Sequence, residues 1–201
     1  MSQKKNKVKF NICNVHYAKL LSNSAEGASF ETPIAMAGAV SISLSPNGEP
    51  SNFYADGYAY HTISNNTGYD GDLELALIPE SFLVDILKEE LDENGVLIED
   101  SNVETENFAL LFEFDGDVRK IRHVMYNCSA SRPEIASQTK EETTTPEKET
   151  ITIKASPLAT GRVKGKTGSE TTQDAYDNWY KVVYYPSGDS TAKVEPETEG
   201  E

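Results

Sequence analysis

Long apolar runs and cysteine are both scarce in this 201-residue sequence. No stretch approaches the roughly eighteen consecutive apolar residues of a membrane-spanning helix, and the basic first residues lack the apolar core of a signal peptide. The two cysteines, Cys13 and Cys128, lie far apart and match no zinc or redox motif. We therefore expect a soluble domain whose thiols stay reduced, as in a cytosol.

Positive charge is nearly absent from the middle of the chain. Residues 21–117 contain twenty acidic residues and a single basic one, Lys88, whereas residues 1–20 contain five lysines and no acid. A block with a net charge of −19 repels the phosphates of nucleic acids and of anionic lipids. These charges argue against specific nucleic-acid binding and against a membrane partner.

Motifs that carry chemistry are missing as well. The chain has no Gly-x-Ser-x-Gly nucleophile elbow, and Gly165-Lys166-Thr167 lacks the preceding glycine of a phosphate-binding loop. Acidic residues are too numerous for any one pair to indicate a glycosidase. We therefore predict that the protein is not an enzyme and that it binds no cofactor or metal.

Three acidic residues alternate within residues 69–75. Asp70, Asp72 and Glu74 could together ligate calcium, which prefers carboxylate oxygens. On a strand, however, residues two apart share one face, and the alternate leucines within residues 73–77 occupy the opposite face. The polar face of a strand is therefore the favoured interpretation, and a metal site is the alternative.

Alternating apolar and polar residues predict a chain made mostly of β-strands. The clearest pattern runs from Phe108 to Phe114 and leads through Asp115–Asp117 into a second apolar run, which predicts a hairpin. Further strands are predicted at 8–12, 40–44, 73–77 and 150–155.

One flanking helix is predicted at about Pro79–Glu90. Pro79 suits the first position of a helix, Glu80 suits the positive end of its dipole, and an apolar stripe follows within residues 82–87. A second, shorter helix is indicated at 172–180. The predicted fold class is mainly β, an antiparallel β-sandwich or barrel with one helix on its flank and long loops.

Residues 1–186 are predicted to form one domain. The arm at 1–7 is basic and expected to be flexible, whereas the tail at 187–201 is acidic and expected to be disordered. Segment 45–60 is expected to be a long loop, and segment 137–149 a polar loop or hairpin.

Four aromatic residues cluster in the expected loop at 45–60, namely Phe53, Tyr54, Tyr58 and Tyr60. Such residues can stack on sugars or bases, but they more often pack in cores or subunit interfaces, where tyrosine gives a large contact area at low entropic cost. The surrounding acidic block disfavours base stacking. Core packing or a subunit interface is therefore the commoner interpretation.

Four sequence blocks together resemble a known family. They are NVHYA (14–18), GYDGDLELALIPESF (68–82), FALLFEFDGDVRKIRHVMYNCSASRP (108–133) and YDNWYKVVY (176–184). Their order and spacing resemble the major tail proteins, or tail-tube proteins, of long-tailed, non-contractile bacteriophages and prophages of Gram-positive bacteria. The resemblance spans about residues 7–186, and the acidic tail departs from it most.

The resemblance implies a structural subunit that self-assembles into stacked rings, typically hexameric, around a tape-measure protein. The hollow tube then conducts double-stranded DNA to the host without binding it specifically, and tail terminator and distal tail proteins are further partners. The implied location is the virion tail, after synthesis in the host cytoplasm. An acidic lining suits such a conduit, because lysines and arginines would retain the DNA through counterion release.

Assembly residues are predicted from charge and composition. The lysines of the N-terminal arm are candidates for docking on the acidic block of an adjacent subunit, or they only aid solubility. The four clustered aromatic residues are candidates for a contact between rings, and the three alternating acids for a strand face or the lumen. A non-enzymatic carbohydrate- or receptor-binding β-sandwich of a virion or phage-like device is the alternative function. The arm lysines are Lys4, Lys5, Lys7 and Lys9.

Overall fold

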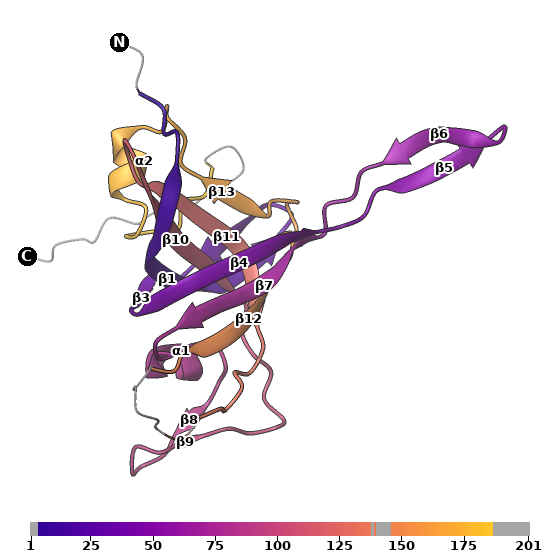
Figure 1. The fold of residues 1–201 in the computed structure, drawn as a ribbon. Helices are drawn as coiled ribbons and strands as arrows, with labels where there is room; N and C mark the ends of the chain where they lie inside the picture. Colours follow the sequence, from indigo (N-terminus) through magenta and orange to yellow (C-terminus); the bar gives the residue numbers. More distant parts are fainter. Residues whose placement is uncertain (1–3, 138, 140–145, 187–201) are drawn as a thin grey trace, which may run out of the picture.

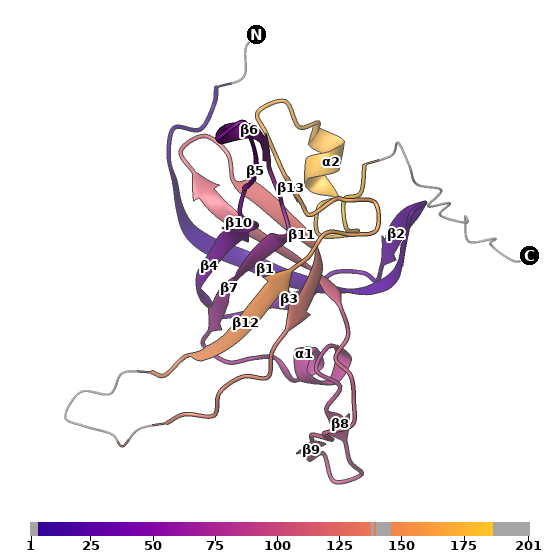
Figure 2. The same ribbon diagram turned by 90° about the vertical axis from the view of Figure 1, so that its right-hand side faces the viewer.

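The computed structural model describes residues 4–137, 139 and 146–186, which fold around one large antiparallel sheet (Figure 1). Its strands are β1 (Lys9–Ser24), β2 (Gly27–Phe30), β3 (Ile34–Met36), β4 (Ala39–Asn47), β7 (Gly68–Leu75), β10 (Phe108–Gly116), β11 (Ile121–Ala130), β12 (Glu149–Ala155) and β13 (Lys164–Lys166). They pair in the order β2-β1-β10-β11-β12-β7-β4, while β3 pairs with β1 and β13 with β11. Strands β1 and β4 lie at opposite sides of this order yet contact each other, so the sheet curls towards a barrel (Figure 2).

The mainly β, antiparallel fold class predicted from the sequence is confirmed. The predicted hairpin corresponds to β10 and β11, which pair from Phe108 opposite Cys128 to Phe114 opposite Ile121. No helix in the described part of the chain is long and apolar enough to cross a membrane. The segment expected at 137–149 lies partly outside the described residues, and the tail at 187–201 lies wholly outside them.

The larger apolar core lies on one face of β10 and β11, inside the curled sheet. Phe108, Leu110 and Phe112 of β10 belong to it. Helix α1 (Glu80–Asp85) contributes Phe82, which is 1% exposed. The Phe82 ring meets the rings of Tyr17 and Phe108 edge-on, at centroid distances of 5.2 and 5.3 Å. This geometry is favourable for aromatic pairs, and the neighbouring Ile86 of the helix C-terminus packs in the same core, so α1 is fixed against it.

A second apolar cluster covers the opposite face of the same two strands. Ala109 and Leu111 of β10 pack there with Trp179 and Val183. Those two residues belong to the segment that follows helix α2 (Gln173–Asp177). As a result, β10 is buried on both faces from Phe108 to Glu113.

Helix α1 is shorter than the sequence predicts. Pro79 is its N-cap rather than its first residue, and the helix ends at Asp85 instead of extending to Glu90. Lys88 adopts a left-handed backbone conformation with φ of 63°, which cannot continue a right-handed helix. The chain then forms a small hairpin of β8 (Glu90–Leu91) and β9 (Leu97–Ile98).

The segment expected to be a long loop at 45–60 is largely a second, separate hairpin. Strand β4 extends to Asn47, and β5 (Ser51–Ala55) pairs with β6 (Tyr58–Ile63). Asp56 and Gly57 join these strands with φ angles of 53° and 81°. Both left-handed conformations are those of a two-residue type I′ turn, for which Asp-Gly is a preferred sequence.

The alternation of Val8, Phe10 and Ile12 does not produce one buried face. Val8 and Phe10 are 56% and 55% exposed, whereas Ile12 packs against the core. The register of β1 against β10 shifts between Phe10 and Ile12, and Asn11 has a left-handed φ of 51°. Such a bulge interrupts the strict alternation of side chains along a strand.

Replacing Phe82 with alanine is expected to lower the free energy of unfolding by about 3–5 kcal/mol, because it removes a fully buried ring and leaves a cavity beside Tyr17 and Phe108. Urea denaturation measures the difference. Leu77→Ala is the matched control, since Leu77 is 67% exposed, and its effect is expected to stay within about 0.5 kcal/mol. Similar small losses in both variants would contradict the packing of α1.

Candidate assembly surfaces

The hairpin β5–β6 projects away from the main sheet and pairs with no other strand (Figure 1). Its two strands are exposed at every position except Ala55, so neither face packs against the main sheet. A lone two-stranded hairpin is at best marginally stable in water. The predicted aromatic residues all lie on this hairpin: Phe53, Tyr54, Tyr58 and Tyr60 are 60%, 66%, 55% and 64% exposed.

The three alternating acids lie on the polar face of β7, as predicted. Leu73 and Leu75 of the same strand are fully buried. Asp70 accepts a hydrogen bond from the Asn47 amide (2.7 Å) and Asp72 one from the Thr152 hydroxyl (2.8 Å). The third acid, Glu74, pairs with the Lys148 ammonium at 2.6 Å, and hydrogen bonds from Lys148 and Ser41 lower its pKa. In the described part of the chain, no cluster of His, Cys, Asp and Glu could hold a metal ion.

The N-terminal arm is attached to the turn between β10 and β11 by Asn6. The side-chain amide of Asn6 donates to the carbonyl of Arg119, and its oxygen accepts from the N–H groups of Val118 and Arg119 at 2.9 and 3.0 Å. The adjacent Lys7 N–H donates to the Asp117 carboxylate (2.8 Å). The arm therefore lies against the rest of its own chain where it meets this turn.

The arm lysines differ in their surroundings. The Lys9 ammonium lies 4.7 Å from the ring centroid of Phe114, a cation–π contact within the subunit. Lys4 and Lys5 line a cleft beside the β10–β11 turn. Docking of the four lysines on the acidic block of an adjacent subunit stays a prediction.

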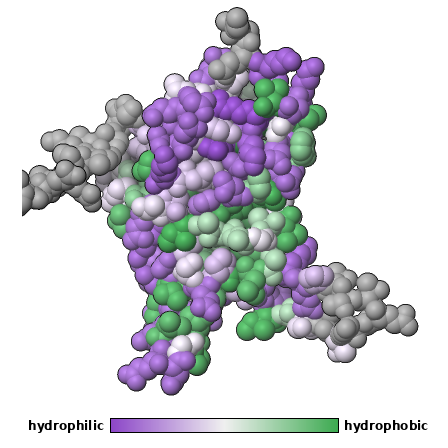
Figure 3. All heavy atoms as spheres, turned by 90° about the vertical axis from the view of Figure 1, so that its left-hand side faces the viewer, coloured by the Kyte–Doolittle hydropathy of each residue, from purple (hydrophilic) through white to green (hydrophobic). Residues whose placement is uncertain are grey.

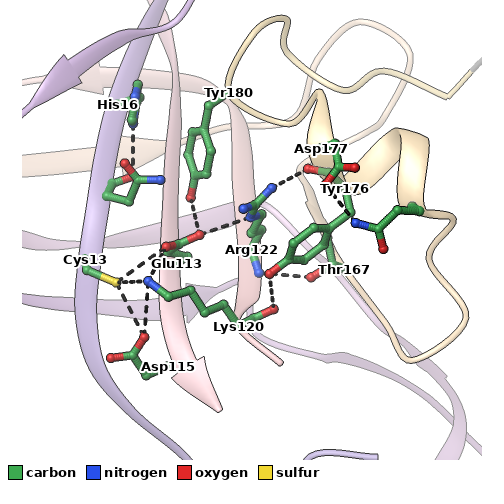
Figure 4. Close-up of polar contacts among 12 residues, drawn as sticks. Cys13, His16, Glu113, Asp115, Lys120, Arg122, Thr167, Tyr176, Asp177 and Tyr180 are labelled. Carbon is green, nitrogen blue, oxygen red and sulfur yellow. Dashed lines mark hydrogen bonds and ion pairs between the residues drawn. The ribbon is translucent and has the colours of Figure 1, made fainter. Parts of the chain in front are cut away.

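A buried charge network that sequence reasoning missed links β10 and β11 to the C-terminal segment (Figure 4). Glu113 is 2% exposed. One carboxylate oxygen pairs with the Lys120 ammonium at 2.8 Å, and the other with the Arg122 guanidinium at 3.0 Å. The Tyr180 hydroxyl donates to the second oxygen (3.3 Å). Burial alone would raise the pKa of Glu113, but Lys120 and Arg122 outweigh it and lower this pKa.

Two guanidinium groups hold the aromatic ring of Tyr176 in α2. The central carbons of Arg119 and Arg122 lie 3.6 and 3.7 Å from the centroid of that ring, and Arg122 also donates to the Tyr176 carbonyl (Figure 4). Stacked guanidinium groups retain their charge while packing closely. The network therefore fixes α2 on the sheet.

Cys13 lies at the edge of this network but is not an activated thiol. Burial is the main influence on it and raises its pKa, although the Lys120 ammonium donates to its Sγ at 3.4 Å. A reactive cysteine requires a lowered pKa. The network thus has a structural role, and its sequence signal was the acid at 113 followed by the basic run within 119–122.

His123 of β11 lies in an apolar and cationic environment. Its ring stacks on Phe112, with a centroid distance of 5.1 Å. Burial, together with the charges of Lys9, Lys166 and Lys164, lowers the pKa of His123 to about 4. The packing interpretation of this residue is consistent with that position, and the imidazole is neutral at neutral pH.

Comparison with solved structures finds a similarity in fold. No protein-family model matches the chain, and no curated protein matches it significantly. Among solved structures, the cryo-EM structure of the anti-feeding prophage (AFP) baseplate, 6-fold symmetrised, contains a similar chain. The two are 12% identical with a TM-score of 0.47, over 84% of this chain and 99% of that one. At these values the similarity assigns neither a family nor a function.

Glu113→Gln is expected to destabilise the protein by about 3 kcal/mol at neutral pH, because it leaves the Arg122 guanidinium without its counter-charge, while Lys120 keeps its weaker pair with Asp115 at 3.4 Å. The lowered pKa of Glu113 also makes the stability of the protein depend on pH. The contribution of the charged Glu113 is complete above its unfolded-state pKa of about 4.3 and is lost as the pH falls through the lower folded-state pKa. Chemical denaturation at several pH values measures both effects.

The exposed Glu26 provides the control for this variant. Glu26→Gln is expected to change the stability by less than about 0.5 kcal/mol. If Glu113→Gln were equally harmless, the ion network would not hold the C-terminal segment in place.

His123→Gln is expected to remove a pH dependence of stability on the acid side of neutrality. Since the folded-state pKa of His123, about 4, lies below the ordinary value of 6.5, the unfolded chain binds this proton more readily. The wild type therefore loses stability as the pH falls from 6.5 towards 4, and the variant loses less. Thermal unfolding across this range tests the difference. If the stability of His123→Gln fell with pH as steeply as that of the control His61→Gln, the lowered pKa of His123 would be refuted.

Proposed function

We propose that the protein is a structural subunit of a phage tail tube, or of the tube of a phage-like device, and that it assembles with copies of itself into stacked rings. The observation that carries this proposal is the projecting hairpin β5–β6 with its four exposed aromatic residues (Figure 1). The resemblance of the four sequence blocks to tail-tube proteins supports the same function, and hexameric rings follow from that resemblance. Residues 1–186 act as one domain in this proposal.

The hairpin is proposed to contact a neighbouring ring. Its strands rise about 3.3 Å per residue, so the hairpin projects by roughly 15–20 Å. Tyrosine and phenylalanine are enriched in the cores of protein interfaces, where they bury a large area at low entropic cost. A partner surface would stabilise the hairpin and cover these side chains together.

The acidic face of β7 is proposed to border the lumen. Asp70 and Asp72 are exposed there, and their charges repel the phosphates of passing double-stranded DNA. Within such a tube, the tape-measure protein occupies the lumen during assembly, and terminator and distal tail proteins contact the tube ends. The protein has no catalytic role in this proposal.

Negative-stain electron microscopy of the concentrated wild-type protein tests the proposed function. Hollow rods built of stacked rings are expected. A protein that stays monomeric when concentrated, and also when produced together with its tape-measure protein, would contradict the proposal.

Replacing the aromatic residues of the hairpin is expected to abolish rods while leaving the monomer folded. The variant is Phe53→Ser/Tyr58→Ser, and because neither ring contacts the core, the free energy of unfolding should change by less than about 0.5 kcal/mol. Rod formation is scored by microscopy and folding by circular dichroism. Val182→Ser is the control, since Val182 is 60% exposed and follows α2, away from the hairpin. Normal rods from the hairpin variant would refute its role.

A further inference from the structure

A basic cleft of about 690 Å³ lies beside α2, between the N-terminal arm and the β10–β11 turn. Among the described residues, no acidic side chain lines it. The surface around this end of the molecule is mostly hydrophilic, whereas apolar side chains gather over the middle of the face in Figure 3. The basic residues that line the cleft are Lys4, Lys5, Arg119, Lys120 and Lys166.

Most of this positive charge is unpaired within the described residues. Lys120 is neutralised by Glu113, but Lys4, Lys5 and Lys166 form no ion pair with the described part of the chain. An anionic group entering the cleft would therefore gain attraction without displacing an existing partner.

Arg119 gives a second, independent indication of a missing acceptor. One of its terminal nitrogens donates to the carbonyl of Thr171 (3.3 Å), and its guanidinium stacks on Tyr176. The other terminal nitrogen, Nη2, is buried and has no hydrogen-bond partner among the described residues. A buried donor without an acceptor costs free energy, and Arg119 itself lines the basic cleft.

The end of the described chain lies close to this cleft. Pro186 lines a neighbouring cleft that also contains Thr172 and Ala175 of the α2 region, while Gln173 and Tyr176 face the basic cleft. Lys166 lines both clefts. The remaining fifteen residues, 187–201, include five acids and one lysine.

We propose that the acidic segment 187–201 binds the basic cleft of its own chain. The length is sufficient, because fifteen residues span up to about 50 Å when extended. A segment tethered at Pro186 reaches the cleft at an effective concentration on the order of millimolar, which favours binding within one chain over binding between chains. The carboxylates supply the acceptors that Arg119 lacks, and this docking does not depend on the proposed tube function.

Competition with a synthetic peptide tests the proposal in the full-length protein. A fluorescent peptide with the sequence of residues 187–201 is titrated at about 0.15 M salt into the wild type and into a neutral-tail variant, and its anisotropy is measured. The neutral-tail variant should bind the peptide at least about tenfold more tightly than the wild type, whose own segment occupies the cleft. The neutral-tail substitutions are Asp189→Asn, Glu195→Gln, Glu197→Gln, Glu199→Gln and Glu201→Gln.

Matched substitutions in the neutral-tail variant identify the cleft. Lys4→Gln/Lys5→Gln/Lys166→Gln should weaken peptide binding at least about tenfold, because it removes the unpaired cations. At about 0.15 M salt, charges more than about 8 Å apart are largely screened, so removing the same charge elsewhere should change the affinity less than about twofold. Equal weakening in both sets, or no binding to the neutral-tail variant, would overturn the proposal. The control set is Lys148→Gln/Lys154→Gln/Lys181→Gln.

Zero-length carbodiimide cross-linking of dilute wild-type protein identifies the occupant. Mass spectrometry should find links from Lys4, Lys5 or Lys166 to carboxylates in 187–201. In a mixture of isotope-labelled and unlabelled protein, these links should join only residues of the same chain. Mixed-isotope links would overturn docking within one chain, and links from these lysines to acids in 21–117 would assign the cleft to the acidic block instead.

Discussion

The hairpin of β10 and β11 is covered on both faces, and much of the architecture follows from that double burial. One face is covered by the other strands of the curled sheet and by the ring of Phe82. The other face is covered by the C-terminal segment, which includes Trp179. A strand buried on both sides has no solvated position for a charge, so Glu113 is stable there only because Lys120 and Arg122 neutralise it.

The same requirement explains why the first and last described segments lie near the central hairpin. Asn6 satisfies backbone groups of the β10–β11 turn that would otherwise lack a partner. The guanidinium groups of Arg119 and Arg122 hold α2 through Tyr176. The basic run that neutralises the buried acid thus also positions the terminal segments, and it leaves surplus positive charge in the cleft between them.

The sequence predicted those strands in which residues of one kind recur at every second position. The period-two pattern from Phe108 to Phe114 and the acids of β7 correspond to the expected strand faces. Other features depend on backbone geometry or on distant partners. The bulge at Asn11 exposes Phe10, and the left-handed Lys88 shortens α1, although neither residue type demands this conformation.

The candidate surfaces were predictable to different degrees. The aromatic residues of segment 45–60 were predicted as candidates for a contact surface, but their hairpin was not predicted, because its strands bury neither face and therefore show no alternating pattern. Only the Asp56-Gly57 turn indicated it. The basic cleft was not predicted, because it brings together residues more than a hundred positions apart, as the contacts of Asn6 illustrate. The pairing of Glu113 with Lys120 and Arg122 was also missed, although these residues lie only seven and nine positions apart.

The pairing of the first strand with the tenth sets the order in which the protein can fold during synthesis. β1 leaves the ribosome long before β10, its main partner, and loops of that length close slowly. The acidic stretch between them leaves the ribosome before β10, and the repulsion between its carboxylates opposes premature collapse and aggregation. Folding of the nascent chain therefore awaits the translation of β10 and β11, and the fold is completed only when the C-terminal segment covers their second face.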